Sequence, residues 1–244
     1  MERRRGSLVF ALAIVLSTGS GAAGYEATTV SNAGALEGKV VFNGPKPPPR
    51  KVTPTKDAEV CGGPREAAQI AVSSDGAVGD AVVFIQKVAQ GKAWDKSASP
   101  PLLTNHQCEF TPRVQIVPIG TEMEFSNGDP VFHNLHAFLD KSTIHNVSLP
   151  KSGRKIRRPL GEPGMVRVDC DSHSWMRAWI FVAGSPYYAQ TGPDGRFVIK
   201  DVPPGTYTIM AWHEYTGVTE VPVTVKADAP SPVTVTLQKN GAAK

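Results

Sequence analysis

The sequence lacks the features that mark several large classes of protein. Its first apolar run, residues 8–16, is far shorter than the about 20 residues that a membrane-spanning helix needs. A large excess of one charge is also lacking. The full chain has 26 basic and 22 acidic side chains, and without residues 1–24, which hold three arginines and one glutamate, 23 and 21 remain. The aromatic-interleaved basic surfaces and zinc-finger spacings of nucleic-acid binders are absent. We therefore expect no membrane span in the mature chain and no nucleic-acid partner.

Helical periodicity and the common catalytic motifs are absent too. There is no nucleophile elbow, no phosphate loop and no H-E-x-x-H sequence. Instead, 23 glycines and 21 prolines divide the chain into short β-branched or alternating runs, which lie at residues 38–42, 81–85, 114–117, 165–168, 179–182, 197–199, 206–209, 221–225 and 233–237. Many short strands must each bury one face against a second sheet, so the predicted class is all-β, built from β-sandwiches.

The first residues predict export. The arginines at positions 3–5 precede the apolar run, and the small residues Ala22, Ala23 and Gly24 follow it. This order is typical of a cleaved signal peptide, which we assign to residues 1–24. The mature chain is expected to be a periplasmic or secreted bacterial protein.

Cysteine is scarce, and its odd number is informative. An exported protein normally pairs its cysteines, but three cannot all pair within one chain. Cys61 lies in a Val-Cys-Gly-Gly turn, Cys108 precedes Glu-Phe-Thr-Pro, and Cys170 lies in the stretch CDSHSWM. We predict a disulfide between Cys61 and Cys108, which leaves Cys170 as a free thiol with another purpose.

The stretch CDSHSWM predicts a soft-metal site. Cys170, His173 and Met176 supply a thiolate, an imidazole and a thioether within seven residues, a donor set that suits copper far better than magnesium, calcium or structural zinc. A trigonal copper site needs a second histidine from another strand. His133 begins such a strand just after an Asn-Gly-Asp-Pro turn, at a sandwich end where binding residues are usually carried.

The ordered quartet His133, Cys170, His173 and Met176 resembles the blue-copper cupredoxins, such as amicyanin, pseudoazurin and plastocyanin, and its short ligand loop is most like that of amicyanin and pseudoazurin. The resemblance covers residues 104–184. It implies a cupredoxin-like Greek-key β-sandwich that binds one type 1 copper, with the two histidines and the thiolate as close ligands and Met176 as the long axial ligand. Asn134 is expected to link the two ligand loops by hydrogen bonds. The resemblance also implies that electrons pass through an exposed edge of His173.

The chain after the site resembles a second family. An Asp194-Gly195 turn, a strand, a Pro-Pro-Gly205 turn and another strand resemble the carboxypeptidase-regulatory-like, or prealbumin-like, β-sandwich. The earlier strands of that family match residues on the far side of the copper region. We therefore predict one discontinuous domain from residues 35–90 and 186–240, with simple tandem domains as the alternative.

Together these features predict a protein that is not an enzyme and that carries single electrons to or from a periplasmic redox partner protein. One alternative is a binding module, for carbohydrate or protein, on a cupredoxin-like scaffold that does not use its metal, because function lives in the site and not in the fold. A second alternative is a copper chaperone or store.

Overall fold

The described chain is made almost entirely of β-strands. The computed structural model describes residues 24–95, 99–151 and 153–239, and in these ranges the one α-helix is the four-residue α1 (Ala58–Cys61). The predicted all-β class is confirmed. Residues 1–23 of the predicted signal peptide lie outside the described residues, and no helix in the described part is long and apolar enough to cross a membrane.

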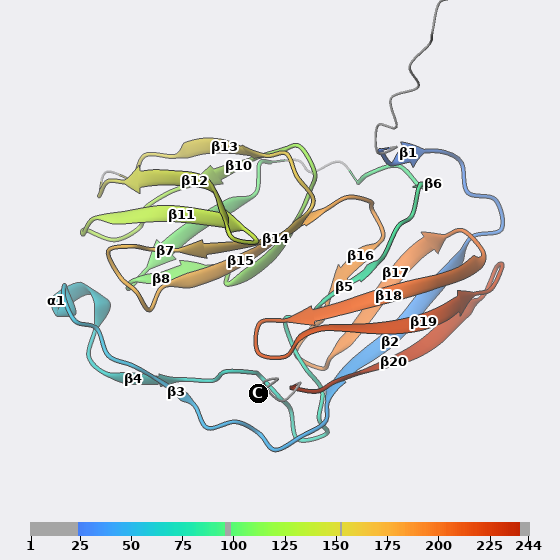
Figure 1. The fold of residues 1–244 in the computed structure, drawn as a ribbon, viewed down its shortest axis with the longest axis horizontal. Coiled ribbons are helices and arrows are strands. Elements are labelled where there is room, and N and C mark those ends of the chain that lie inside the picture. Colours follow the sequence, from blue (N-terminus) through green and yellow to red (C-terminus); the bar gives the residue numbers. More distant parts are fainter. Residues whose placement is uncertain (1–23, 96–98, 152, 240–244) are drawn as a thin grey trace, which may run out of the picture.

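The middle of the chain forms the first of two β-sandwiches (Figure 1). One of its sheets has the order β13-β10-β7-β8, with bounds Ile156–Leu160, Thr121–Phe125, Leu102–His106 and Glu109–Thr111. The other has the order β12-β11-β14-β15-β9, with bounds Ser142–Leu149, His133–Leu139, Gly164–Asp169, Arg177–Ala183 and Val114–Pro118. The buried side chains between the sheets include Leu103, Leu135 and Ile180, so the alternating sequence pattern buries one face of each sheet. This is the cupredoxin-like sandwich that the sequence predicts.

The second sandwich combines strands from both ends of the chain. Its four-stranded sheet has the order β16-β5-β18-β19, with bounds Tyr188–Gln190, Val82–Ile85, Gly205–His213 and Gly217–Val225. Its three-stranded sheet has the order β17-β2-β20, with bounds Arg196–Val202, Gly34–Phe42 and Pro230–Leu237. Strand β2 therefore lies between two strands that follow it by more than 150 residues. Early and late segments share one core, although the exact domain boundaries at 35–90 and 186–240 stay a prediction.

Packing is close where these early and late segments meet. A Cβ atom added to Gly38 of β2 would lie 2.5 Å from both the Phe197 ring and the Val233 carbonyl oxygen. Only a residue without a side chain fits there, because the neighbouring backbone cannot move aside cheaply.

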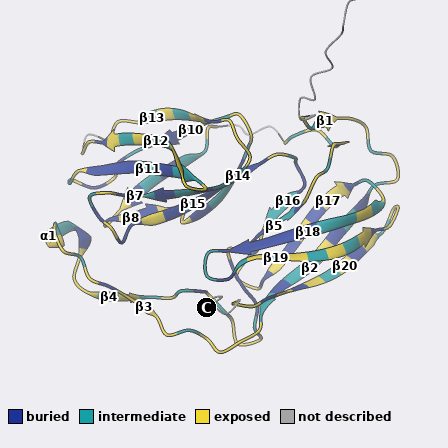
Figure 2. Cartoon of the chain, in the orientation of Figure 1, coloured by how far each residue is buried: buried dark blue, intermediate teal, exposed yellow. Residues whose placement is uncertain are grey.

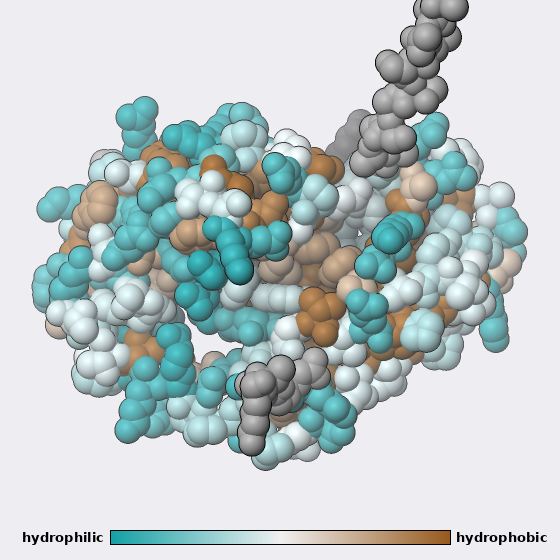
Figure 3. Space-filling model, in the orientation of Figure 1, coloured by the Kyte–Doolittle hydropathy of each residue, from teal (hydrophilic) through white to brown (hydrophobic). Residues whose placement is uncertain are grey.

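The two sandwiches contact each other directly. Buried residues of both, among them Val82, Phe181 and Trp212, form one apolar cluster, and the Arg113 guanidinium pairs with the Glu214 carboxylate at 2.7 Å. Hydrophobic side chains are visible between the two lobes in Figure 3. The interface therefore combines apolar packing with an ion pair.

A long segment between β2 and β5, residues 43–69, leaves the second sandwich and reaches the far end of the first (Figure 1). We call it the arm. It contains β3 (Arg50–Val52), α1 and β4 (Arg65–Ala67), and β3 pairs only with β4 among the described strands. Much of it is exposed in Figure 2, yet Val52 and Cys61 are buried in the core of the first sandwich. The remaining pair, β1 (Glu26–Ala27) and β6 (Gln90–Gly91), is parallel.

Candidate metal centre

The strand order brings three of the four predicted ligands to one end of the first sandwich. Cys170 follows the last residue of β14, His173 lies in the turn that leads to β15, and His133 is the first residue of β11. Because β14 pairs with both β11 and β15, these positions meet at the same end of the neighbouring strands. Met176, the residue before β15, is buried in the same core, and its N–H donates to the carbonyl of His173.

The donor atoms of three residues converge. The Cys170 Sγ lies 3.8 Å from the Nδ1 of His133 and 3.7 Å from the Nδ1 of His173. A metal bound by sulfur at about 2.3 Å and by nitrogen at about 2.0 Å, at trigonal angles of about 120°, would hold sulfur and nitrogen about 3.7 Å apart. All three side chains are buried. The three donor atoms therefore fit a soft metal ion in size, chemistry and arrangement.

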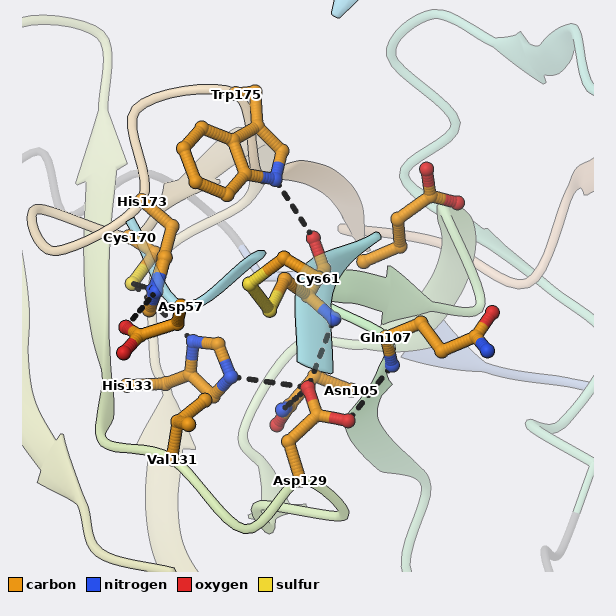
Figure 4. Close-up of a disulfide and its surroundings, with 12 residues drawn as sticks. Asp57, Cys61, Asn105, Gln107, Asp129, Val131, His133, Cys170, His173 and Trp175 are labelled. Carbon is orange, nitrogen blue, oxygen red and sulfur yellow. Dashed lines mark hydrogen bonds and ion pairs between the residues drawn. A yellow bond between two sulfur atoms is a disulfide. The ribbon is translucent and has the colours of Figure 1, made fainter. Parts of the chain in front are cut away.

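A carboxylate holds the far side of each histidine ring (Figure 4). The Nε2 of His133 lies 3.0 Å from an oxygen of Asp129, and the Nε2 of His173 lies 2.9 Å from an oxygen of Asp57. In each pair Nε2–H donates to the carboxylate, which leaves the Nδ1 lone pair free to face Cys170. Carboxylate–histidine pairs of this kind fix ring orientation and raise ligand basicity at metal sites.

The expectation that His173 has an exposed edge is wrong. Its side chain has 0% exposure, because Asp57 of the arm lies on its Nε2 and Trp175 packs edge-on against its ring. The sequence does not predict that Asp57 covers His173, since the two residues are 116 positions apart along the chain. The disulfide predicted between Cys61 and Cys108 is present, and it ties the arm to the first sandwich beside the site.

Asp129 is a site residue that the sequence analysis missed. It accepts hydrogen bonds from the N–H groups of Gln107 and Cys108 and from the amide of Asn105, besides its contact with His133. Burial raises the pKa of Asp129, but these hydrogen bonds hold its pKa below the usual value. The sequence feature that could have identified Asp129 is its place in the Asn-Gly-Asp-Pro turn, four residues before His133.

Burial also sets the protonation of the ligands. It lowers the pKa of His133, and the neighbouring His173 lowers it further, although Asp129 acts in the opposite sense; the net lowering favours the neutral ring that a metal ligand requires. Burial raises the pKa of the Cys170 thiol, although the N–H groups of Asn134, His173 and Ser172 face the sulfur and act in the opposite sense. Metal binding is therefore expected to displace the thiol proton.

Asn134 links the two ligand-bearing segments, as its position suggests. Its side-chain oxygen accepts a hydrogen bond from the N–H of Asp171 at 2.7 Å, and its amide donates to the Asp171 carboxylate at 2.7 Å. The neighbouring His136 lies outside the cluster, with its ring nitrogens near Asp171 and Thr143. The segments that carry His133 and Cys170 are thus joined next to the sulfur.

Comparison with known families shows two similarities. The model of the carboxypeptidase regulatory-like domain matches residues 164–238. The match begins in β14, a strand of the first sandwich, and so spans strands of both sandwiches. A comparison with curated protein sequences finds no match.

Several similar solved structures are cupredoxins. A purple cupredoxin from Nitrosopumilus maritimus is 21% identical with a TM-score of 0.31, and covers 34% of this chain and 99% of its own. A reduced amicyanin variant is 15% identical with a TM-score of 0.32, and covers 41% of this chain and 98% of its own. A copper-containing nitrite reductase from Thermus scotoductus is 24% identical with a TM-score of 0.31, and covers 41% of this chain but only 25% of its own.

Such TM-scores are too low to assign a function to this chain. Both resemblances predicted from the sequence are nevertheless found. The chain is similar to cupredoxins in one part and to the carboxypeptidase regulatory-like domain over residues 164–238.

Proposed function

We propose that this protein binds one type 1 copper ion and carries single electrons. The observation that supports this most strongly is the convergence of the His133 and His173 Nδ1 atoms on the Cys170 sulfur, at 3.8 and 3.7 Å. A copper ion held there would supply one-electron chemistry by alternating between its two common oxidation states. Met176 is the proposed axial ligand, since it is buried in the same core.

The protein's own contribution is a fixed donor geometry. Asp129 and Asp57 hold the two rings by Nε2, and Asn134 joins the segments that carry His133 and Cys170. Residues held this firmly keep the same positions in both oxidation states, so little reorganisation accompanies electron transfer.

Carrier function is favoured over catalysis at the metal. Catalytic metal sites keep a coordination position open to substrate. Here His133 and His173 are 0% exposed and Cys170 is 2% exposed, so no substrate reaches their donor atoms. We therefore propose a carrier rather than an enzyme. Because residues 1–24 resemble a cleaved signal peptide, we propose that it is exported to the periplasm and exchanges electrons with a partner protein there.

A redox titration of the copper-loaded protein tests this function. We expect one copper per chain and a reversible one-electron transition that is followed by a visible absorption band. Tight cuprous binding, ready release to a competing chelator and no reversible cycling would instead identify a chaperone or store. Binding of glycan or protein that survives loss of both His133 and Met176, without copper uptake, would identify a binding module.

A further inference from the structure

The arm closes the route by which electrons would enter through a histidine edge. Asp57 accepts the hydrogen bond from His173 Nε2, and the Cys61–Cys108 disulfide holds the arm against the first sandwich. His173 therefore shows no atom to solvent. A redox partner must exchange electrons through a different group.

Trp175 is the group that connects the cluster to the surface. Its ring lies edge-on to the His173 ring, with centroids 5.1 Å apart, and its Nε1 donates to the carbonyl of Cys108 (Figure 4). The residue is 9% exposed, and it lines two clefts of about 300 and 160 Å³. It thus touches a proposed ligand on one side and solvent-filled space on the other.

The side chains around these clefts are strongly basic. Arg50, Arg113 and Arg177 line both clefts, Lys239 lines the larger one and Arg65 the smaller one. We call these five residues the basic rim. The acidic residues among the lining side chains are Glu214 and Glu109, which pair with Arg113 and Arg65.

Arg177 of the basic rim pairs with Asp169, which lines neither cleft, so two members of the rim are left without an acidic partner among the described residues. Arg50 and Lys239 are exposed and form no ion pair among the described residues. Arg50 belongs to the arm, Lys239 follows the last strand, and Arg177 begins β15 of the first sandwich. The rim therefore combines three separate parts of the chain. Cations contributed by separate parts of the chain form a broad positive surface. Such a surface is better suited to attracting an oppositely charged protein than to binding one small ion.

We infer that Trp175 is the electron port of this protein and that the basic rim docks the acidic face of a one-electron redox protein. The inference rests on the proposed function. With copper bound, the His173 and Trp175 side chains would carry one electron from the reduced metal to the acceptor. The copper would be oxidised by one electron and the acceptor reduced by one, with no bond or proton transferred.

Stopped-flow oxidation of the copper(I)-loaded full chain tests the port. The probes are anionic hexacyanoferrate(III) and cationic tris(phenanthroline)cobalt(III), each over a range of ionic strengths. We expect the rate with the anion to fall as salt increases, and Trp175→Leu to lower it at least several-fold while the visible band of the oxidised protein persists. At low ionic strength Arg50→Glu should lower the rate with the anion roughly tenfold.

The matched control is Arg154→Glu. Arg154 is an exposed arginine of the segment before β13 that lines neither cleft, so its charge reversal should leave the rate close to that of the unmodified protein. A rate with hexacyanoferrate(III) that is unchanged by Arg50→Glu would overturn the docking surface, even if Trp175→Leu fails to fold. An unchanged rate in a folded Trp175→Leu protein would overturn the port.

The probes also distinguish other sources of failure. Faster oxidation by the cationic complex, with a rate that rises with salt for the anionic one, would show that the basic rim does not govern the approach of the oxidant and would overturn the inference. Absence of any thiolate-to-copper band in the unmodified protein would instead overturn the proposed function, and this inference with it.

Discussion

Replacing Asp129 with alanine is expected to lower both the stability of the protein and its affinity for copper. The change leaves the buried N–H of Cys108 without its acceptor and removes one of the two acceptors of the buried Asn105 amide, at a cost of about 1–3 kcal/mol for each buried group. It also frees the Nε2 of His133, and loss of such a partner lowers metal affinity about 10- to 100-fold. Urea unfolding of the metal-free protein and a copper competition titration measure the two effects separately.

The matched control for Asp129→Ala is Glu162→Ala. Glu162 is an exposed carboxylate that forms no ion pair among the described residues, so removing it tests the loss of one negative charge alone. It should change neither quantity appreciably, because surface substitutions of this kind usually alter stability by less than about 0.5 kcal/mol. Asp129→Ala with unchanged stability and unchanged copper affinity would show that Asp129 does not support His133.

Removing the disulfide with the double substitution Cys61→Ala and Cys108→Ala is expected to produce the other large loss. The two cysteines are 47 residues apart, and cross-linking a chain over that distance stabilises the folded state by about 4 kcal/mol in the chain-entropy model. For a chain of this size that loss corresponds to a melting temperature lower by about 10 °C. Thermal unfolding followed by circular dichroism measures the shift.

A reducing agent supplies the control for this experiment. It should lower the melting temperature of the unmodified protein toward that of the double variant and leave the variant itself unchanged. The arm should also loosen over the site, so that the N–H of His173 Nε2 exchanges faster with solvent once Asp57 is no longer held. Equal melting temperatures for the unmodified protein and the variant under oxidising conditions would contradict the structural role of the disulfide.

The local part of the site could be predicted from the sequence. Three of the four proposed ligands lie within seven residues, and a strand followed by a tight turn has few ways to arrange them. His133 could be added because the cupredoxin pattern places it at the start of a strand. The distant part could not be predicted, since Asp57 reaches His173 only through the path of the arm.

The fold shows the same division between local and distant information. The Asp194-Gly195 and Pro203-Pro204-Gly205 turns could be predicted, because each precedes a strand as its residue types require. The arm was missed, since its strands are only three residues long and its helix has four. Short elements carry no readable periodicity, and the arm is held by a disulfide and by packing rather than by a sheet of its own.

The most direct test of the central claim is the visible and EPR spectrum of the Cu(II)-loaded mature protein, recorded beside Cys170→Ala. A type 1 site predicts an intense blue thiolate-to-copper band with narrow copper hyperfine splitting in the unmodified protein, and loss of both features in the variant. A colourless protein that takes up no copper, or a band that persists without Cys170, would contradict the assignment of this cluster as a copper centre.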